Sequence, residues 1–214
     1  MADLFREIEE DLRRERAERL WKKYGGYVIG AALGIVLTTS GYVGFKEYTS
    51  RQRLADGERY AAALVELRPG AEASAAEALA MVAREVGSGY AMLARLREAA
   101  LRAEAGERGG AIAIYDAIAA DDGVEPLFRD PALLLSVMHQ MDAAGPDALI
   151  ERLAPLTADD NPWRHSALEA SGVLAFRSGA HGRAREIFTR LADDATTPRA
   201  LRARAAEMLA ILGE

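Results

Sequence analysis

The feature of this sequence that most constrains its fold is a run of 22 residues without a charge, residues 24–45, YGGYVIGAALGIVLTTSGYVGF. The chain as a whole is 28% charged, so such a run stands apart from its surroundings. A helix rises about 1.5 Å per residue, which makes this run about 33 Å long and matches a bilayer core of about 30 Å. The run therefore predicts a transmembrane helix.

The flanks of the run favour an anchor that is not cleaved. A secretory signal has a short basic start, an apolar stretch of about 7–15 residues and a small-residue cleavage site. Here a charged leader of 23 residues precedes the run, and Phe45-Lys46-Glu47-Tyr48 follows where a cleavage site would stand. A buried helix of a soluble protein usually carries fewer uncharged residues in a row. A cleaved signal remains the alternative.

The basic residues around the run predict its orientation. Seven Lys and Arg residues precede it, six of them within eleven residues of its start, and those that follow are sparser. Because an excess of Lys and Arg marks the cytoplasmic flank, the N-terminus is expected inside and residues 46–214 outside. The chain then divides into a cytoplasmic amphipathic leader (1–23), the transmembrane helix (24–45) and one external domain (46–214).

Three glycines recur at intervals of four within the run: Gly26, Gly30 and Gly34. Residues four apart share a helix face, and glycine there lets a second backbone approach closely. The pattern predicts a packing face for a partner helix. The alternative is that glycine is simply frequent in membrane helices.

The composition of the chain excludes several classes of function. The chain contains no cysteine, which excludes disulfides, thiolate metal sites and cysteine catalysis. The net charge of −6 falls entirely on residues 46–214, because the seven acids and seven bases of the leader cancel. An acidic domain of this kind is a poor binder of nucleic acid.

Residues 46–214 are predicted to be all helical. Alternating β-branched runs are missing, and apolar residues recur every three or four positions, as at Leu201, Ala205, Met208 and Leu212. Gly and Pro clusters divide the region into helices of about 10–20 residues. The breaks are Pro69-Gly70, Gly87-Ser88-Gly89, Gly106, Gly123, Gly145-Pro146, Asp160-Asn161-Pro162, Gly179 and Thr196-Thr197-Pro198. Asn161 and Thr197, each before a proline, are expected to cap helices.

The spacing of small and aromatic residues predicts tetratricopeptide-like hairpins, which are pairs of antiparallel helices repeating about every 34 residues. In such a hairpin a small residue closes the turn, an alanine packs between the helices five residues later, and an aromatic follows four residues further on. Gly179, Ala184 and Phe188 have this spacing, and Gly172 falls where the two helices would cross.

The same pattern occurs earlier in the chain, at Gly106, Ala111 and Tyr115, with Ala99 at the crossing position. Between the two sets, residues 130–155 resemble a degenerate hairpin with a turn at Gly145-Pro146. The fold is therefore predicted to be an α-solenoid of helical hairpins that follows the transmembrane helix. An irregular helical bundle is the alternative.

No catalytic, cofactor or metal site is predicted. The three histidines, His139, His165 and His181, form no metal-binding spacing, and neither a nucleophile-elbow nor a phosphate-loop motif occurs. The most distinctive cluster is Asn161-Pro162-Trp163-Arg164-His165. Trp163 is a candidate interaction residue, and its alternative role is to pack against the preceding helical pair.

The basic flank and uncharged run, together with the segments GYAMLARLREAALRAEAGERGGAIAIYDAIAADDGVEP and NPWRHSALEASGVLAFRSG, resemble the ancillary translocon subunit family of Gram-negative bacteria. The resemblance covers nearly the whole chain. It implies a single-pass protein of the bacterial inner membrane with a periplasmic tetratricopeptide-like domain. It also implies two partners, the SecYEG protein-conducting channel and a membrane-anchored periplasmic chaperone of prolyl-isomerase type.

Three functions are consistent with these observations. The first is a non-enzymatic scaffold at the translocon that binds proteins through a helical-repeat surface, which suits an extended ligand. The second is a scaffold that coordinates cell-envelope or cell-division assembly with the same fold. The third is an enzyme whose site has no recognisable motif. The oligomeric state is not predicted.

Overall fold

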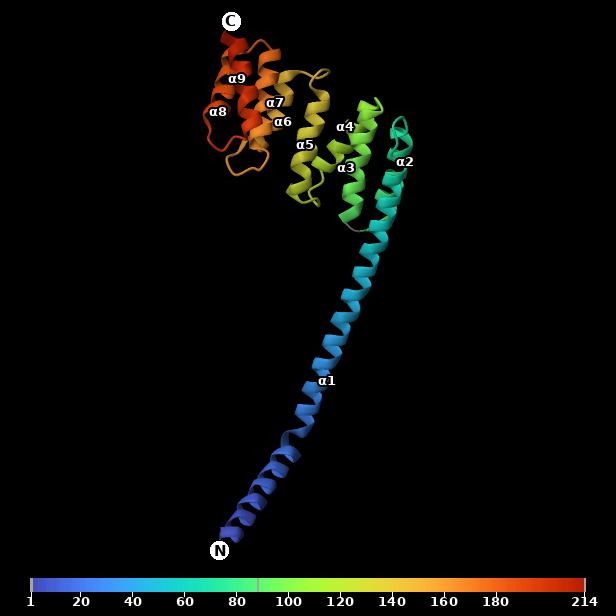
Figure 1. The fold of residues 1–214 in the computed structure, drawn as a ribbon, viewed down its shortest axis with the longest axis vertical. Coiled ribbons are helices and arrows are strands. Elements are labelled where there is room, and N and C mark those ends of the chain that lie inside the picture. Colours follow the sequence, from blue (N-terminus) through green and yellow to red (C-terminus); the bar gives the residue numbers. More distant parts are fainter. Residues whose placement is uncertain (1, 88, 214) are drawn as a thin grey trace. The chain divides into compact units, whose positions relative to one another are not determined.

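The computed structural model describes the backbone of residues 2–87 and 89–213, and their side chains except at residues 2–13, 15–18, 28, 31 and 32. All regular secondary structure in these residues is helical (Figure 1). The helices are α1 (Ala2–Val65), α2 (Glu72–Glu85), α3 (Gly89–Glu104), α4 (Arg108–Ala119), α5 (Pro126–Gln140), α6 (Pro146–Leu153), the 3-10 helix η1 (Ala154–Thr157), α7 (Arg164–Arg177), α8 (His181–Asp193) and α9 (Arg199–Gly213).

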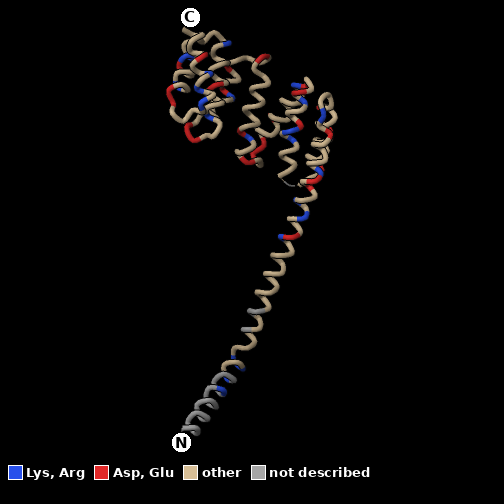
Figure 2. Tube along the Cα trace, viewed as in Figure 1, with Lys and Arg blue, Asp and Glu red and all other residues tan. Residues whose placement is uncertain are grey.

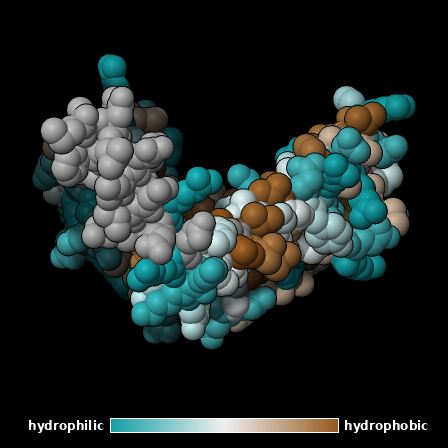
Figure 3. Space-filling view, turned by 90° about the horizontal axis from the view of Figure 1, so that it is seen from below, coloured by the Kyte–Doolittle hydropathy of each residue, from teal (hydrophilic) through white to brown (hydrophobic). Residues whose placement is uncertain are grey.

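The chain divides into two compact units, Met1–Ala55 and Asp56–Glu214. The first unit consists of most of α1, a helix of 64 residues. Its middle part carries no charged side chain (Figure 2). Apolar side chains there are solvent-exposed and form a hydrophobic area on the surface (Figure 3): Ile29, Leu33, Ile35, Val36, Leu37, Val43 and Phe45.

The predicted transmembrane helix over residues 24–45 is contradicted. Among the residues whose placement is described, no helix is long and apolar enough to cross a bilayer. The prediction equated absence of charge with hydrophobicity, although the run also holds tyrosine, threonine, serine and several glycines.

The predicted location and topology are corrected for the same reason. A single-pass inner-membrane protein with a cytoplasmic N-terminus and a periplasmic C-terminal domain requires the helix that the structure lacks within its described residues. The predicted amphipathic face of the leader, residues 1–23, depends on side chains that mostly lie outside the described residues.

The second unit is a stack of helical hairpins. Each helix packs against the next one in the chain, from α2 on α3 to α8 on α9. Further contacts join α3 with α5, α5 with α7, and α7 with α9. The odd-numbered helices therefore form one layer of the stack and the even-numbered helices lie behind them. The prediction of an all-α domain of stacked helical hairpins is confirmed in this part of the chain.

Ser88 lies outside the described residues, and the other residues of the predicted breaks lie between helices or at the first residue of one. Gly106 and Gly179 have φ angles of +86° and +80°, a region that other residues rarely adopt, so they allow the chain to reverse. The Asn161 carboxamide oxygen accepts a hydrogen bond from the Trp163 backbone N–H at 2.8 Å, in the turn before α7. The buried Thr197 hydroxyl has no partner, so its expected capping bond is not formed.

Three separate hydrophobic clusters form the interior of the second unit. The first joins the end of α1 with α2 and α3 and includes Leu79 and Leu101. The second joins α3, α4 and α5 around Tyr115. The largest lies among α5 to α9 and contains Leu174 and Phe188. The stack is thus held together by local cores and not by one central core.

Candidate protein-binding groove

Phe188 lies at the centre of the contact between α7 and α8. Phe188 and Ala184 are fully buried on α8, and the Phe188 ring faces Gly172 on α7. A Cβ atom on Gly172 would lie 2.8 Å from Cζ of Phe188, closer than side chains approach one another. Glycine at this crossing therefore makes room for the ring, and Gly179 closes the turn with its positive φ.

The hairpin of α3 and α4 has the same frame with a different aromatic residue. Ala99 and Ala111 are fully buried, and Tyr115 is almost completely so. Burial raises the pKa of the Tyr115 hydroxyl because it disfavours the phenolate. The Tyr115 ring stacks on the imidazole of His139 from α5, with 5.8 Å between the centroids. This contact joins the hairpin to the next one.

The middle hairpin, α5 with α6, is irregular. Its second helix has 8 residues and continues as η1, and its first helix contains Pro131. A polar network joins it to α4: the buried Ser136 hydroxyl and the Arg152 guanidinium both donate to the Asp116 carboxylate on α4. Gln140 donates to the Ser136 hydroxyl at 2.7 Å.

An apolar groove lies in the odd-numbered layer beside this irregular hairpin. Its volume is about 490 Å³, within the range of roughly 300–1,000 Å³ typical of ligand pockets. Met138 on α5 lines it and is 52% exposed. Trp163 also lines the groove and packs against the core of α5 to α9. The other lining residues are Pro131, Leu134, Leu135, Met141, Ser166, Glu169, Ala170, Val173 and Arg204.

The two charged residues that line the groove form an ion pair with each other. The Arg204 guanidinium on α9 donates from Nε and Nη2 to the two carboxylate oxygens of Glu169 on α7, at 2.6 and 2.9 Å. This two-point contact raises the pKa of Arg204 and fixes α9 against α7. The groove therefore presents an apolar surface with its charges already neutralised.

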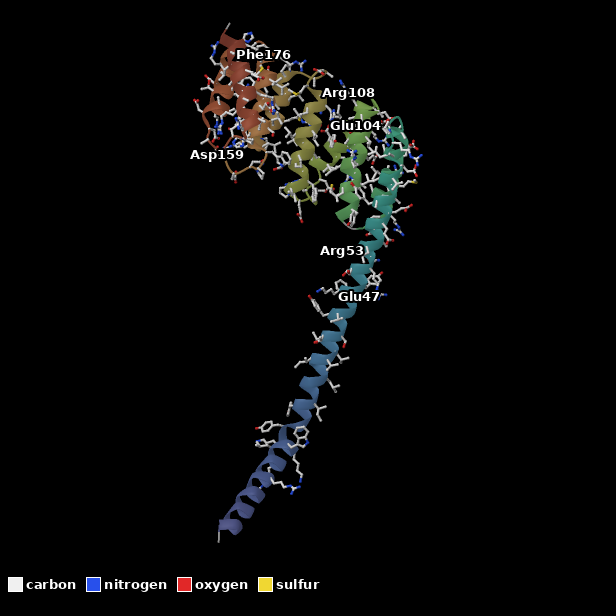
Figure 4. The ribbon with its side chains drawn as sticks, in the orientation of Figure 1. Glu47, Arg53, Glu104, Arg108, Asp159 and Phe176 are labelled. Carbon is white, nitrogen blue, oxygen red and sulfur yellow. The ribbon has the colours of Figure 1, made fainter. Side chains whose placement is uncertain are left out.

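A second polar cluster ties the loop before α9 to the start of α7. The Arg164 guanidinium donates to the Asp194 carboxylate at 2.6 Å and to Asp159 at 3.3 Å. Figure 4 shows Asp159 and Phe176 near opposite ends of α7. Hydrogen bonds from the Thr196 hydroxyl and backbone N–H lower the pKa of Asp194 to about 2.

This cluster is not arranged as a catalytic triad. The His165 Nε2 atom faces Thr196, Asp194 and Arg164 at once, at 3.3, 3.3 and 3.0 Å. In a triad, one ring nitrogen of the histidine bonds the nucleophile hydroxyl and the other ring nitrogen bonds the carboxylate. Across the described side chains, no group of three or more His, Asp or Glu residues is placed to hold a metal ion.

The three predicted packing glycines lie in the first unit. Gly26, Gly30 and Gly34 are exposed, and a Cβ atom added to any of them would meet nothing within 4 Å. Their role in binding a partner helix stays a prediction.

Sequence reasoning placed Trp163 among the interaction candidates but missed the rest of the groove. A usable signal was present in the second half of α5 and at the residue after it, where Leu134, Met138 and Met141 recur at helical spacing. Glu169 and Arg204 are 35 positions apart, and only the tertiary structure brings them together.

A family model described as a tetratricopeptide repeat-like domain matches residues 18–205. The match covers most of the chain, including the groove and both regular hairpins. It indicates no family of enzymes. No curated protein and no solved structure matches the chain.

Proposed function

Because the chain belongs to the tetratricopeptide repeat-like family, we propose that it is a non-enzymatic scaffold that binds other proteins through its odd-numbered helices. Repeats of this type stack into extended surfaces that suit protein ligands. The observation that carries the proposal is the groove between α5, α7 and α9, where a methionine stays half exposed beside a tryptophan. Large apolar side chains in a surface depression are a common mark of a binding site.

The partners that we propose are the SecYEG translocon and a membrane-anchored chaperone of prolyl-isomerase type. Support comes from the resemblance of residues 89–126 and 161–179 to the ancillary translocon subunits, and from the family match over 18–205. Gly26, Gly30 and Gly34 are the proposed contact for a partner helix, because a backbone can approach an exposed glycine face closely. A scaffold for cell-envelope or cell-division assembly is the second candidate, since it would use the same fold.

Co-purification tests this function directly. The tagged full chain is isolated in mild detergent, and the proteins recovered with it are identified by mass spectrometry. Translocon and chaperone subunits should be enriched over a Phe188→Ala control, in which the packing of α7 against α8 is weakened. Gly30→Leu should lower their recovery without unfolding the second unit.

Recovery of division or cell-wall proteins instead would support the second candidate. Equal recovery with the parent and with Phe188→Ala would contradict the scaffold proposal. Saturable binding of a metal ion or small cofactor by the purified chain would favour an enzyme.

A further inference from the structure

The groove between α5, α7 and α9 is apolar along nearly its whole lining. Eight of its eleven lining residues are apolar, and one of the three others is the small Ser166. Met138 and Met141 are among them, and flexible methionine side chains adapt to ligands of different shapes. Such a lining suits several different apolar side chains better than one fixed shape.

The charge of the groove limits its ligand further. Glu169 and Arg204 are bound to each other at two points, so neither offers a free charge to a ligand. A charged ligand group would lose its hydration in the groove and gain no counter-ion there. Acidic ligands are also repelled electrostatically, because residues 46–214 carry the whole net charge of −6.

The size of the groove favours a chain segment over a folded partner. A stable interface between two folded proteins buries about 800 Å² on each side. A depression of about 490 Å³ holds a few side chains, and an apolar stretch of an extended or helical peptide supplies them without a matching flat surface.

We propose that this groove binds an uncharged, apolar segment of another polypeptide, and that the Glu169–Arg204 pair makes it reject charged segments. The proposal rests on the proposed scaffold function and names its class of ligand. With the pair intact, the ligand contacts are made by Met138, Trp163 and their apolar neighbours. Without Arg204, Glu169 is left unpaired at the groove and attracts basic side chains.

Trp163 provides a direct reporter of binding. The chain has two tryptophans, Trp21 and Trp163, so Trp21→Phe in the full-length protein leaves only the one in the groove. The probes are three ten-residue peptides with blocked ends that differ in four central positions. These positions hold Leu-Ile-Phe-Leu in the first peptide, four aspartates in the second and four lysines in the third.

The apolar peptide should shift the Trp163 emission with a saturable titration, and the charged peptides should not. Met138→Glu should weaken its binding by about tenfold or more, because a carboxylate in an apolar site must lose its hydration. Met81→Glu is the matched control, since Met81 is 56% exposed on α2 and lies outside the groove. It should change binding by less than about twofold.

Arg204→Ala tests the role of the ion pair. It should weaken binding of the apolar peptide and allow the lysine peptide to bind, whereas Arg204→Ala with Glu169→Gln should restore the preference for the apolar peptide. The proposal is overturned if no peptide titrates, if all three bind alike, or if Met138→Glu and Met81→Glu behave the same. Unchanged recovery of partners by Met138→Glu would leave the scaffold function standing and remove this groove from it.

Discussion

The hairpin of α7 and α8 and the hairpin of α5 and α6 are adjacent in the stack but differ in how they are closed. The first has helices of 14 and 13 residues and an aromatic ring that fills the crossing at Gly172. The second has helices of 15 and 8 residues and a polar network around Ser136 on its first helix. The groove opens beside the second hairpin.

The comparison indicates that the packing that stabilises the regular hairpin lies between its two helices, whereas the groove lies between hairpins. A full-length second helix and a buried ring hold the two helices of a hairpin together by close packing. A second helix of 8 residues fills less of the space behind its partner, and we attribute the opening between α5 and α7 to this short helix. Trp163 packs against the hydrophobic cluster that both hairpins share.

The largest effect is expected at the centre of the regular hairpin. Phe188→Ala should lower the free energy of unfolding by about 3–5 kcal/mol, because it leaves a cavity under Gly172. Arg183→Ala, on the exposed side of the same helix, should change it by less than about 0.5 kcal/mol. Denaturant melts of the full chain measure both. Equal melts for the two variants would show that the ring does not hold this hairpin.

The next effect is overpacking at the crossing. Gly172→Ala should cost about 1–3 kcal/mol, because its methyl group would stand 2.8 Å from the Phe188 ring. Adding Phe188→Leu should recover part of this loss, since a smaller side chain leaves room for the methyl group. A double-mutant cycle in denaturant melts measures the coupling. Strictly additive losses would contradict the close contact.

The two turns offer a matched pair of glycines. Gly179 closes the regular hairpin at φ +80°, whereas Gly145 closes the irregular one at φ −63°. Gly179→Ala should therefore cost about 1–2 kcal/mol through backbone strain. Gly145→Ala should be neutral or stabilise by up to about 1 kcal/mol, because it restricts the unfolded chain. Neither added Cβ meets an atom within 4 Å, so thermal melts should isolate the backbone effect.

The smallest predicted effect is a dependence of stability on pH. It also concerns the regular hairpin, because Asp194 directly follows α8. The pKa of Asp194 is lowered from 3.8 to about 2, so its stabilising contribution is present above pH 4 and is lost as the pH falls towards 2. Asp194→Asn should therefore reduce the melting temperature at pH 6 and have little effect at pH 2. Asp193→Asn controls for the loss of one negative charge. An equal loss at both pH values would contradict the ionised Asp194 network.

The helices and turns were predictable because their signals are local. Gly106 and Gly179 mark turns that only glycine adopts readily, and the interval between Gly179, Ala184 and Phe188 is a property of one hairpin. The groove was not predictable, since Glu169 and Arg204 meet only after α9 folds back on α7. Thr197 looked like a helix cap, but its hydroxyl is buried without a partner.

The prediction for residues 24–45 was wrong for the opposite reason: a local signal was present, but it does not determine the hydrophobicity of the run. The absence of charge is easy to read in a sequence, whereas hydrophobicity depends on how much glycine, tyrosine and threonine the same run contains. Among the described residues, no helix is long and apolar enough to cross a bilayer. The helical conformation of this run does not distinguish a membrane-spanning segment from any other helix, because α1 is also helical on both sides of it.

The division of the interior into three clusters has a consequence for how the second unit opens. Helices pack almost entirely on their neighbours in the chain, so each cluster loses little when a distant one is exposed to water. Backbone amides of α2 and α3 should then exchange their hydrogens through partial openings that leave α7 and α8 intact. Short-range contacts also make for rapid refolding, so such openings would close again quickly. Under heat or denaturant, the unit would therefore unfold from one end at a time and not in a single cooperative step.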